Sequence, residues 1–253
     1  MTQANRVVLE ASGVSVHFEG LKAVSQMGVR ILAGQVSGVI GPNGAGKSTF
    51  FDALAGLQPT NSGKIQLRGR DVTGMPASER ARLGLARTFQ LGSIVPDLNA
   101  MENVILGFDQ RRRAGGERLS RRAMRSEATQ LLDRVGLGEY RNVLGSNLAE
   151  GVKRQVELMR AVAAGGEVVL LDEPGAGLGD ADRERLARII RSLAEQGHAC
   201  LITDHSTDLV FSVCDHVQVM NFGLQLAEGP PAEIRKHPAV MEAYLGTKEP
   251  TRE

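Results

Sequence analysis

The sequence predicts an α/β protein with a parallel-sheet core, an N-terminal antiparallel β subdomain and an inserted α-helical subdomain. Three observations lead to this fold class. Apolar strand patterns alternate with helical patterns after about residue 165, which is typical of a parallel sheet covered on both faces. Short strand patterns come before residue 90. Between about residues 91 and 165, strand patterns are missing and helical spacing takes their place.

The first 90 residues predict the β subdomain and the start of the core. Residues 14–18 alternate between apolar and polar side chains, as in a half-buried strand. Residues 36–40 form a continuous apolar run that is typical of a buried parallel strand. A further short strand is expected at residues 65–67, and a short helix at 76–84, between a proline and a glycine. We expect the short strands to pair mainly in an antiparallel manner.

The middle of the chain predicts the helical subdomain, residues 91–155. Apolar residues recur at helical spacing over 124–135 and again over 152–163. We therefore expect a single domain of 253 residues, in which residues 1–90 and 156–253 form the core.

The C-terminal third predicts alternating strands and helices. A helix with apolar positions between 186 and 193 ends at Gly197, and another covers 209–213. Pro231 and Pro238 each begin a short helix. Strands are expected at 168–172, 199–203, 216–220 and 224–229, the last two joined by a tight turn.

Composition narrows the class of protein. A formal net charge of +1 gives no general reason to expect nucleic acid or an anionic membrane as a partner. Cys200 and Cys214 have apolar neighbours and no metal-binding spacing, which predicts buried thiols in a reducing compartment. The N-terminus has no export signal, and no apolar run approaches the roughly 20 residues of a membrane span. We therefore expect a cytosolic protein.

The stretch GPNGAGKST follows the apolar strand at 36–40 and precedes a helical pattern, which is the context of a phosphate-binding loop. Its glycines let backbone N–H groups turn toward phosphates, and the helix N-terminus adds partial positive charge. A lysine reaches the β and γ phosphates, and a serine hydroxyl can bind Mg²⁺. The predicted nucleoside-triphosphate site therefore includes Gly41, Pro42, Asn43, Gly44, Ala45, Gly46, Lys47, Ser48 and Thr49.

Two carboxylates follow the buried strand at 168–172. This strand delivers Asp172 at its carboxyl end, where ligands of open α/β sheets bind. Because neighbouring strand residues point to opposite sides, Asp172 and Glu173 are expected to have different roles. Asp172 is expected to bind Mg²⁺ through water or Ser48, and Glu173 to act on the attacking water as its general base or its orienting group.

Other motifs follow in an order that resembles ATP-binding cassette (ABC) ATPases over nearly the whole chain. Gln90 follows LARTF, LAEGVKRQ occupies 148–155, and His205 lies in ITDHS after a predicted strand. ARTFQ, MENVILG, LLDEPGAGL and HPAVMEAYLG are similar to the ATPase subunits of branched-chain amino-acid importers. TDH is also similar to the ATPase of lipopolysaccharide export, which is the nearest alternative.

This resemblance implies a P-loop NTPase fold with a RecA-like core, ATP and Mg²⁺ as ligands, and further site residues. Phe18 would stack on the adenine, and Gln90 would contact Mg²⁺ and the attacking water. His205 would hydrogen-bond the γ-phosphate. Gly151, in the signature segment LAEGV, would face the nucleotide of a second cassette arranged head to tail with this one.

The resemblance also implies partners. These are membrane permease subunits, a second cassette that is either identical or different, and, indirectly, a periplasmic or extracellular solute-binding protein; no nucleic acid is expected. The protein would then lie on the cytoplasmic face of the membrane as a peripheral subunit. Branched-chain amino acids lead as the transported substrate, while urea, amides and aromatic acids remain open.

Two segments depart from the family pattern. Ala149 and Glu150 replace residues of the signature L-S-G-G-Q, and a carboxylate near a triphosphate is repulsive. The segment Gly177–Asp180 replaces S-A-L-D and has its acidic residue displaced by one position. We expect the nucleotide site shared between two cassettes to be usable, but to bind the triphosphate less favourably. Seven arginines within 111–125 predict a solvated hairpin, or contact with an acidic protein surface or anionic lipid headgroups.

The leading hypothesis is therefore an ATP-hydrolysing, energy-coupling subunit of a transporter. A soluble ABC ATPase of translation or DNA repair is a second hypothesis, although such proteins usually carry two cassettes or a long coiled coil. A non-catalytic cassette is a third: Lys47, Glu173 and His205 argue against it, and Glu150 and Gly179 in its favour.

Overall fold

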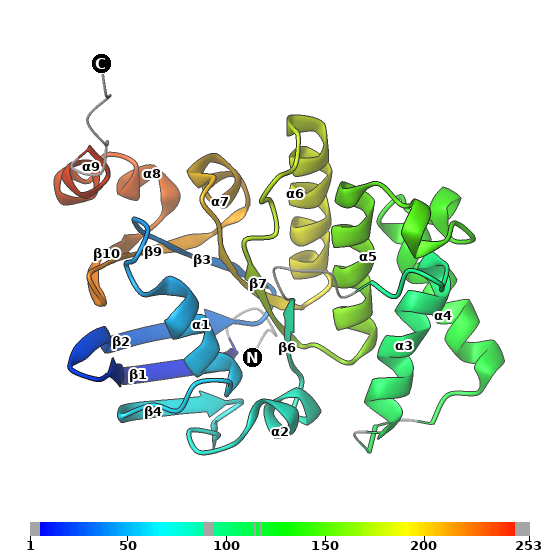
Figure 1. Ribbon diagram of the computed structural model, residues 1–253, viewed down its shortest axis with the longest axis horizontal. Coiled ribbons are helices and arrows are strands. Elements are labelled where there is room, and N and C mark those ends of the chain that lie inside the picture. Colours follow the sequence, from blue (N-terminus) through cyan, green and yellow to red (C-terminus); the bar gives the residue numbers. More distant parts are fainter. Residues whose placement is uncertain (1–5, 89–93, 114, 117, 246–253) are drawn as a thin grey trace.

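The computed structural model describes residues 6–88, 94–113, 115–116 and 118–245. A six-stranded sheet forms the centre, with helices on one face and helix α1 (Lys47–Ala55) on the other. A four-stranded antiparallel sheet lies beyond α1, so that α1 is enclosed between two sheets (Figure 1). The predicted α/β fold class is confirmed.

The six-stranded sheet has the order β10-β9-β3-β8-β7-β6. Strands β9, β3, β8, β7 and β6 are parallel, and β10 pairs with β9 in an antiparallel manner. Because parallel strands end at the same edge, the residues after β3 and after β7 meet there. The strands are β3 (Val36–Ile40), β6 (Leu85–Thr88), β7 (Val168–Asp172), β8 (Ala199–Thr203), β9 (His216–Asn221) and β10 (Leu224–Gly229).

The antiparallel sheet has the order β2-β1-β4-β5. The sequence led us to expect only short strands in this part of the chain, and that expectation is wrong for β1 and β2. These two strands have 12 residues each, and β2 carries no simple alternation in the sequence. Its buried residues Val24, Met27 and Ile31 are spaced by three and four, because register shifts interrupt its pairing with β1 and Gln26 has a positive φ. The strands are β1 (Val7–Phe18), β2 (Leu21–Leu32), β4 (Ser62–Leu67) and β5 (Arg70–Asp71).

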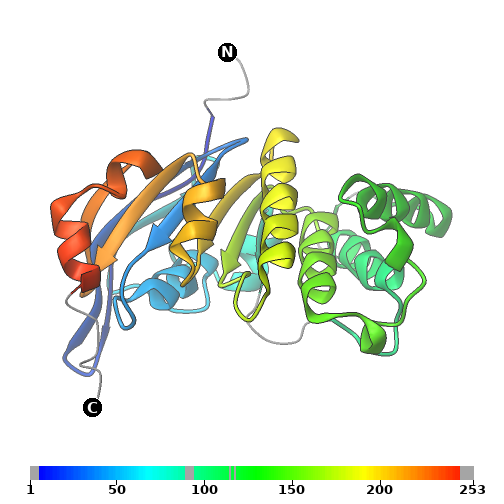
Figure 2. The same ribbon diagram turned by 90° about the horizontal axis from the view of Figure 1, so that it is seen from above.

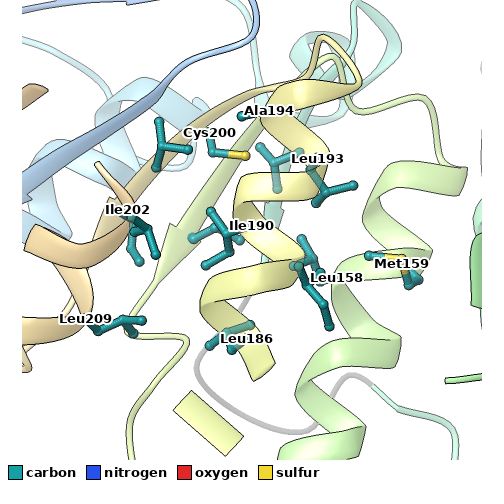
Figure 3. Close-up of a cluster of buried hydrophobic side chains, with 14 of the residues drawn as sticks. Leu158, Met159, Leu186, Ile190, Leu193, Ala194, Cys200, Ile202 and Leu209 are labelled. Atoms are coloured by element: carbon teal, nitrogen blue, oxygen red, sulfur yellow. The ribbon is translucent and has the colours of Figure 1, made fainter. Parts of the chain in front are cut away.

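Helices from the second half of the chain cover the face of the six-stranded sheet that is turned away from α1. Figure 3 shows Leu158 of α5 and Ile190 of α6 packed in a cluster with Cys200 and Ile202 of β8. Burial raises the pKa of the Cys200 thiol to about 12, as expected for a structural cysteine. The helices of this part are α5 (Glu150–Ala163), α6 (Asp180–Glu195), α7 (Thr207–Val213), α8 (Pro231–Ile234) and α9 (Pro238–Leu245).

Helices α3 (Ala100–Arg113) and α4 (Arg121–Arg134) lie at one end of the molecule, away from the antiparallel sheet (Figure 2). Two short 3₁₀ helices, Gly138–Tyr140 and Gly145–Asn147, lead from α4 to α5. The predicted boundary at residue 155 falls inside α5, and the division into subdomains stays a prediction. No helix within the described part of the chain is both long and apolar enough to cross a membrane.

Arg80 of helix α2 (Ala77–Arg82) fixes the C-terminal end of α1. Its side chain is 1% exposed and donates to the carbonyl oxygens of Ala53 and Leu54 at 2.7 Å. It also donates to those of Thr73 and Met75 at 2.8 and 3.0 Å. A buried guanidinium thus adds a donor for carbonyls at the helix end, of which that of Ala53 also accepts from the N–H of Gly56 at 3.2 Å.

Replacing Arg80 by Met is expected to lower the free energy of unfolding by about 3 kcal/mol, because several buried carbonyls lose their donor. For a chain of this size, that corresponds to a fall in melting temperature of roughly 6–12 °C. Thermal unfolding measures the effect. Arg82→Met, at an exposed position of the same helix, is the control and should change stability by less than about 0.5 kcal/mol. Equal melting temperatures for the two variants would contradict the capping role.

Candidate functional site

The loop between β3 and α1 is shaped by glycines in close contact with neighbouring strands. Gly46 precedes α1 with φ +100°, and no side chain caps this helix. A Cβ on Gly46 would clash with the carbonyl oxygen of Ala23 in β2, and one on Gly41 with that of Met220 in β9. The loop therefore presents bare backbone and an uncapped helix N-terminus, which together favour an anion.

Lys47 lies in the first turn of α1 and is 7% exposed. Its Nζ donates to the carbonyl oxygens of Gly41 and Pro42, at 2.7 and 2.9 Å. Burial lowers the pKa of Lys47, while the charges of Glu173 and Asp172 raise it. The ammonium group is therefore held inside the loop, next to the two carboxylates at the end of β7.

The remaining loop residues differ in exposure. Ala45 is buried, and its carbonyl oxygen accepts from the N–H of Gly223 in the turn between β9 and β10. This bond ties the loop to the neighbouring hairpin. The side exposed to solvent carries Asn43, Gly44 and Ser48, while Pro42 and Thr49 are half-buried.

Asp172 ends β7 and is 3% exposed. Its Oδ2 accepts from Nη2 of Arg87 at 2.7 Å, and Arg87 also forms an ion pair with Asp52 of α1. The other oxygen, Oδ1, is buried and has no hydrogen-bond partner among the described residues. A buried acceptor without a partner is costly, and a cation or its bound water would satisfy it.

Glu173 and His205 form a pair at the same edge of the sheet. His205 Nε2 lies 2.8 Å from Glu173 Oε1. The backbone of Glu173 has φ +50°, a strained value for this residue type, and its N–H donates to the carbonyl oxygen of Thr203 at 2.8 Å. The chain turn after β7 thus holds a carboxylate beside an imidazole, an arrangement suited to orienting and deprotonating a water molecule.

Two residues of this site were missed by the sequence analysis. Arg87 is the charged residue of the short strand β6 (LART), and a charged side chain within a strand of the core indicates that a partner of opposite charge lies nearby. Asp204, 4% exposed, accepts from the N–H groups of Gly175 and Ser206 at 2.8 Å. It therefore fastens the segments that carry Glu173 and His205.

The signature segment lies at the start of α5. A Cβ on Gly151 would lie within 3 Å of the carboxylate of Asp182 in α6, so a side chain here would require Asp182 to move. The Glu150 carboxylate is exposed and turned toward Lys153 Nζ and Arg154 Nε, at 3.8 and 3.7 Å. Positive charge thus lies beside this carboxylate, and the weakened site expected from the sequence stays a prediction.

The other predicted residues lie apart from this centre or outside the described residues. Phe18 is 43% exposed at the end of β1, next to the part of β2 that contacts Gly46. Asp180 begins α6 as a solvent-exposed residue 3.3 Å from Arg183. Gln90 lies outside the described residues. The arginines of 111–125 that the structure describes are mostly exposed at the ends of α3 and α4, and their role stays a prediction.

Residues 24–176 match the ABC transporter family, and the chain belongs to this family. Residues 225–250 match the C-terminal segment of branched-chain amino acid ATP-binding cassette transporters. The family assignment made from the motif order is thereby confirmed.

Several proteins are similar over almost their full length. The chain is 35% identical to the high-affinity branched-chain amino acid transport ATP-binding protein BraF of Pseudomonas aeruginosa, over 96% of this chain and 99% of that protein. It is 34% identical to the lipopolysaccharide export ATP-binding protein LptB of Acidithiobacillus ferridurans, over 94% and 97%. The crystal structure of the ADP conformation of MJ1267, an ATP-binding cassette of an ABC transporter, matches with a TM-score of 0.85 at 25% identity, over 95% of this chain and 99% of that one.

The contact of Gly46 with β2 leaves no room for a side chain at this position. Gly46→Ala is expected to lower the free energy of unfolding by about 2 kcal/mol more than Gly44→Ala. Both positions have a positive φ, but a Cβ on Gly44 meets no atom within 4 Å, so this variant measures the backbone strain alone. Denaturant unfolding without nucleotide provides the comparison. Equal losses in the two variants would show that β2 does not constrain the loop.

Proposed function

We propose that this chain is the ATP-hydrolysing, energy-coupling subunit of an ABC transporter that imports branched-chain amino acids. Similarity to BraF over nearly the full length of both proteins carries this proposal. The C-terminal match at residues 225–250 favours it over the lipopolysaccharide-export alternative, which has weaker support. The complete pair of Glu173 and His205 beside Lys47 argues against a non-catalytic cassette.

In this function the loop at 41–49 binds the phosphates of ATP. Backbone N–H groups and the N-terminus of α1 supply the donors, and Lys47 exchanges its bonds to loop carbonyls for bonds to phosphate. Phe18 provides a face for the adenine. Glu173 orients and deprotonates the attacking water, while His205 holds this carboxylate and contacts the γ-phosphate.

The site fits Mg²⁺ in the manner of a nucleotide-bound cation. No group of three or more His, Cys, Asp or Glu side chains suited to a metal occurs in the described part of the chain, so phosphate and water would supply most ligands. The protein would contribute Ser48, Gln90 and Asp172, whose Oδ1 is buried without a partner. Bound Mg²⁺ would neutralise charge that develops on the phosphates during hydrolysis.

A groove of about 510 Å³ between α2, β6, the end of α3 and α5 is the proposed docking site of a permease subunit. We call it the α2–α5 groove. Alanines form much of its lining, and Arg82, Arg113 and Arg160 add positive charge. A short helical segment with small and acidic side chains would complement it. Docking here would place the chain on the cytoplasmic face of the membrane. In a head-to-tail pair of cassettes, Gly151 would face the nucleotide of the second cassette.

Glu173→Gln is expected to reduce kcat for ATP hydrolysis by about 10²- to 10⁴-fold, because the amide cannot accept a proton. ATP affinity should change little, and the variant should accumulate as a nucleotide-bound dimer. Phosphate release, equilibrium binding and size-exclusion chromatography measure these three properties. Glu184→Gln, at an exposed position of α6, is the matched control. Unchanged turnover in Glu173→Gln would remove its catalytic assignment.

The transport role is tested by purification of the tagged chain from native membranes in mild detergent, followed by mass spectrometry. Multi-span permease subunits and a second cassette are expected to co-purify, and uptake of labelled leucine should fall when the gene is deleted. An untagged strain is the control. Recovery of an active ATPase from the soluble fraction alone would contradict energy coupling and favour a soluble complex.

A further inference from the structure

We propose that Arg87 is a positioning residue that orients Asp172 for Mg²⁺ and links this carboxylate to the α2–α5 groove. The inference rests on the proposed function, in which Asp172 binds the Mg²⁺ that accompanies ATP. It concerns a residue three positions before Gln90, outside both the phosphate loop and the predicted metal ligands.

The Arg87 guanidinium joins three elements. It belongs to β6, its Nη1 pairs with Asp52 of α1, and its Nη2 donates to Oδ2 of Asp172 at the end of β7. The side chains of Arg87 and Asp172 are only 10% and 4% exposed. A planar guanidinium that binds two carboxylates on different elements has little freedom to rotate, so it fixes the plane of the buried Asp172 carboxylate.

This contact determines which oxygen of Asp172 is available. Oδ2 is occupied by Arg87, whereas the buried Oδ1 has no hydrogen-bond partner within the described residues. Metal-binding carboxylates are commonly held in this way by a hydrogen bond to their second oxygen, and loss of such a partner typically weakens metal binding by about 10- to 100-fold. The arrangement therefore matches that of a metal ligand held by its neighbour.

Arg87 also lies at the α2–α5 groove. Arg87 and Thr88 line this groove together with residues of α2, α3 and α5. Arg87 thus pairs with the carboxylate proposed to bind the metal and also contributes to the lining of the proposed permease site. A segment that enters the groove would pack near Arg87, and any shift of β6 would be transmitted to Asp172 through the bond of 2.7 Å.

A purely structural role makes a different prediction. If Arg87 only tied α1 to β6 through Asp52, its replacement would lower the melting temperature and leave metal affinity unchanged. If Arg87 positions Asp172, Arg87→Lys should weaken metal binding in the folded protein, because an ammonium group cannot hold both carboxylates in the same geometry.

The test uses the full chain with Mn²⁺ as the probe and AMP-PNP as a non-hydrolysable ATP analogue. Mn²⁺ is added to the protein in the presence of AMP-PNP, and the concentration of free Mn²⁺ is measured by electron paramagnetic resonance. The affinity for AMP-PNP without metal is measured separately in EDTA. Arg87→Lys is expected to raise the Mn²⁺ dissociation constant by about 10- to 100-fold, with AMP-PNP affinity in EDTA changed by less than about twofold. In an Asp172→Asn background, the same substitution should add no further loss of Mn²⁺ affinity.

The matched control is Arg191→Lys, which alters another Arg–Asp pair, 2.9 Å long, that joins α6 to Asp215 away from the site. It should leave both affinities unchanged. Parent-like Mn²⁺ affinity in folded Arg87→Lys would overturn the positioning role. If this variant does not fold, Arg87→Gln, which keeps one amide donor, is measured instead. A raised Mn²⁺ dissociation constant would again support the positioning role, and an unchanged one would overturn it. Failure of the parent chain to bind AMP-PNP would instead refute the proposed function.

Discussion

Burial of helix α1 between the two sheets is the constraint on which the site depends. Phe50, Phe51 and Leu54 are fully buried, and their contacts reach the antiparallel sheet on one side and the six-stranded sheet on the other. Each such side chain contributes roughly 1.5–3 kcal/mol relative to exposure. Because α1 cannot move between these layers, the loop before it is fixed at its helical end.

The same packing explains why the loop can be built of backbone alone. Gly41 and Gly46 lie against carbonyl oxygens of β9 and β2, so the loop is held by close contact without side chains of its own. Lys47 completes the loop by donating to Gly41 and Pro42. In the proposed function, an incoming phosphate would compete for these bonds with the full charge of an anion, and Lys47 would turn from the loop carbonyls to the phosphate.

Charge balance at the edge of the sheet links the site to the rest of the chain. Arg87 pairs with carboxylates of α1 and β7, while Lys47 is placed near Asp172 and Glu173. In a poorly hydrated environment these interactions are stronger than at the surface, and a change at one member affects the others. In the proposed function, this network is the physical connection between the nucleotide and the groove where a permease would dock.

Local features of this protein could be predicted from its amino-acid sequence alone. The loop at 41–49, the acidic end of the strand at 168–172 and the helix end at Gly197 follow from short-range rules of backbone freedom and periodicity. Only the tertiary structure revealed strand β2, whose register shifts break the alternation that would identify it. It also decided the contacts of Arg80 with α1, Arg87 with Asp172, and Gly151 with Asp182. These contacts join residues from 26 to 85 positions apart, and no periodic pattern in the chain encodes which distant side chains will be buried together.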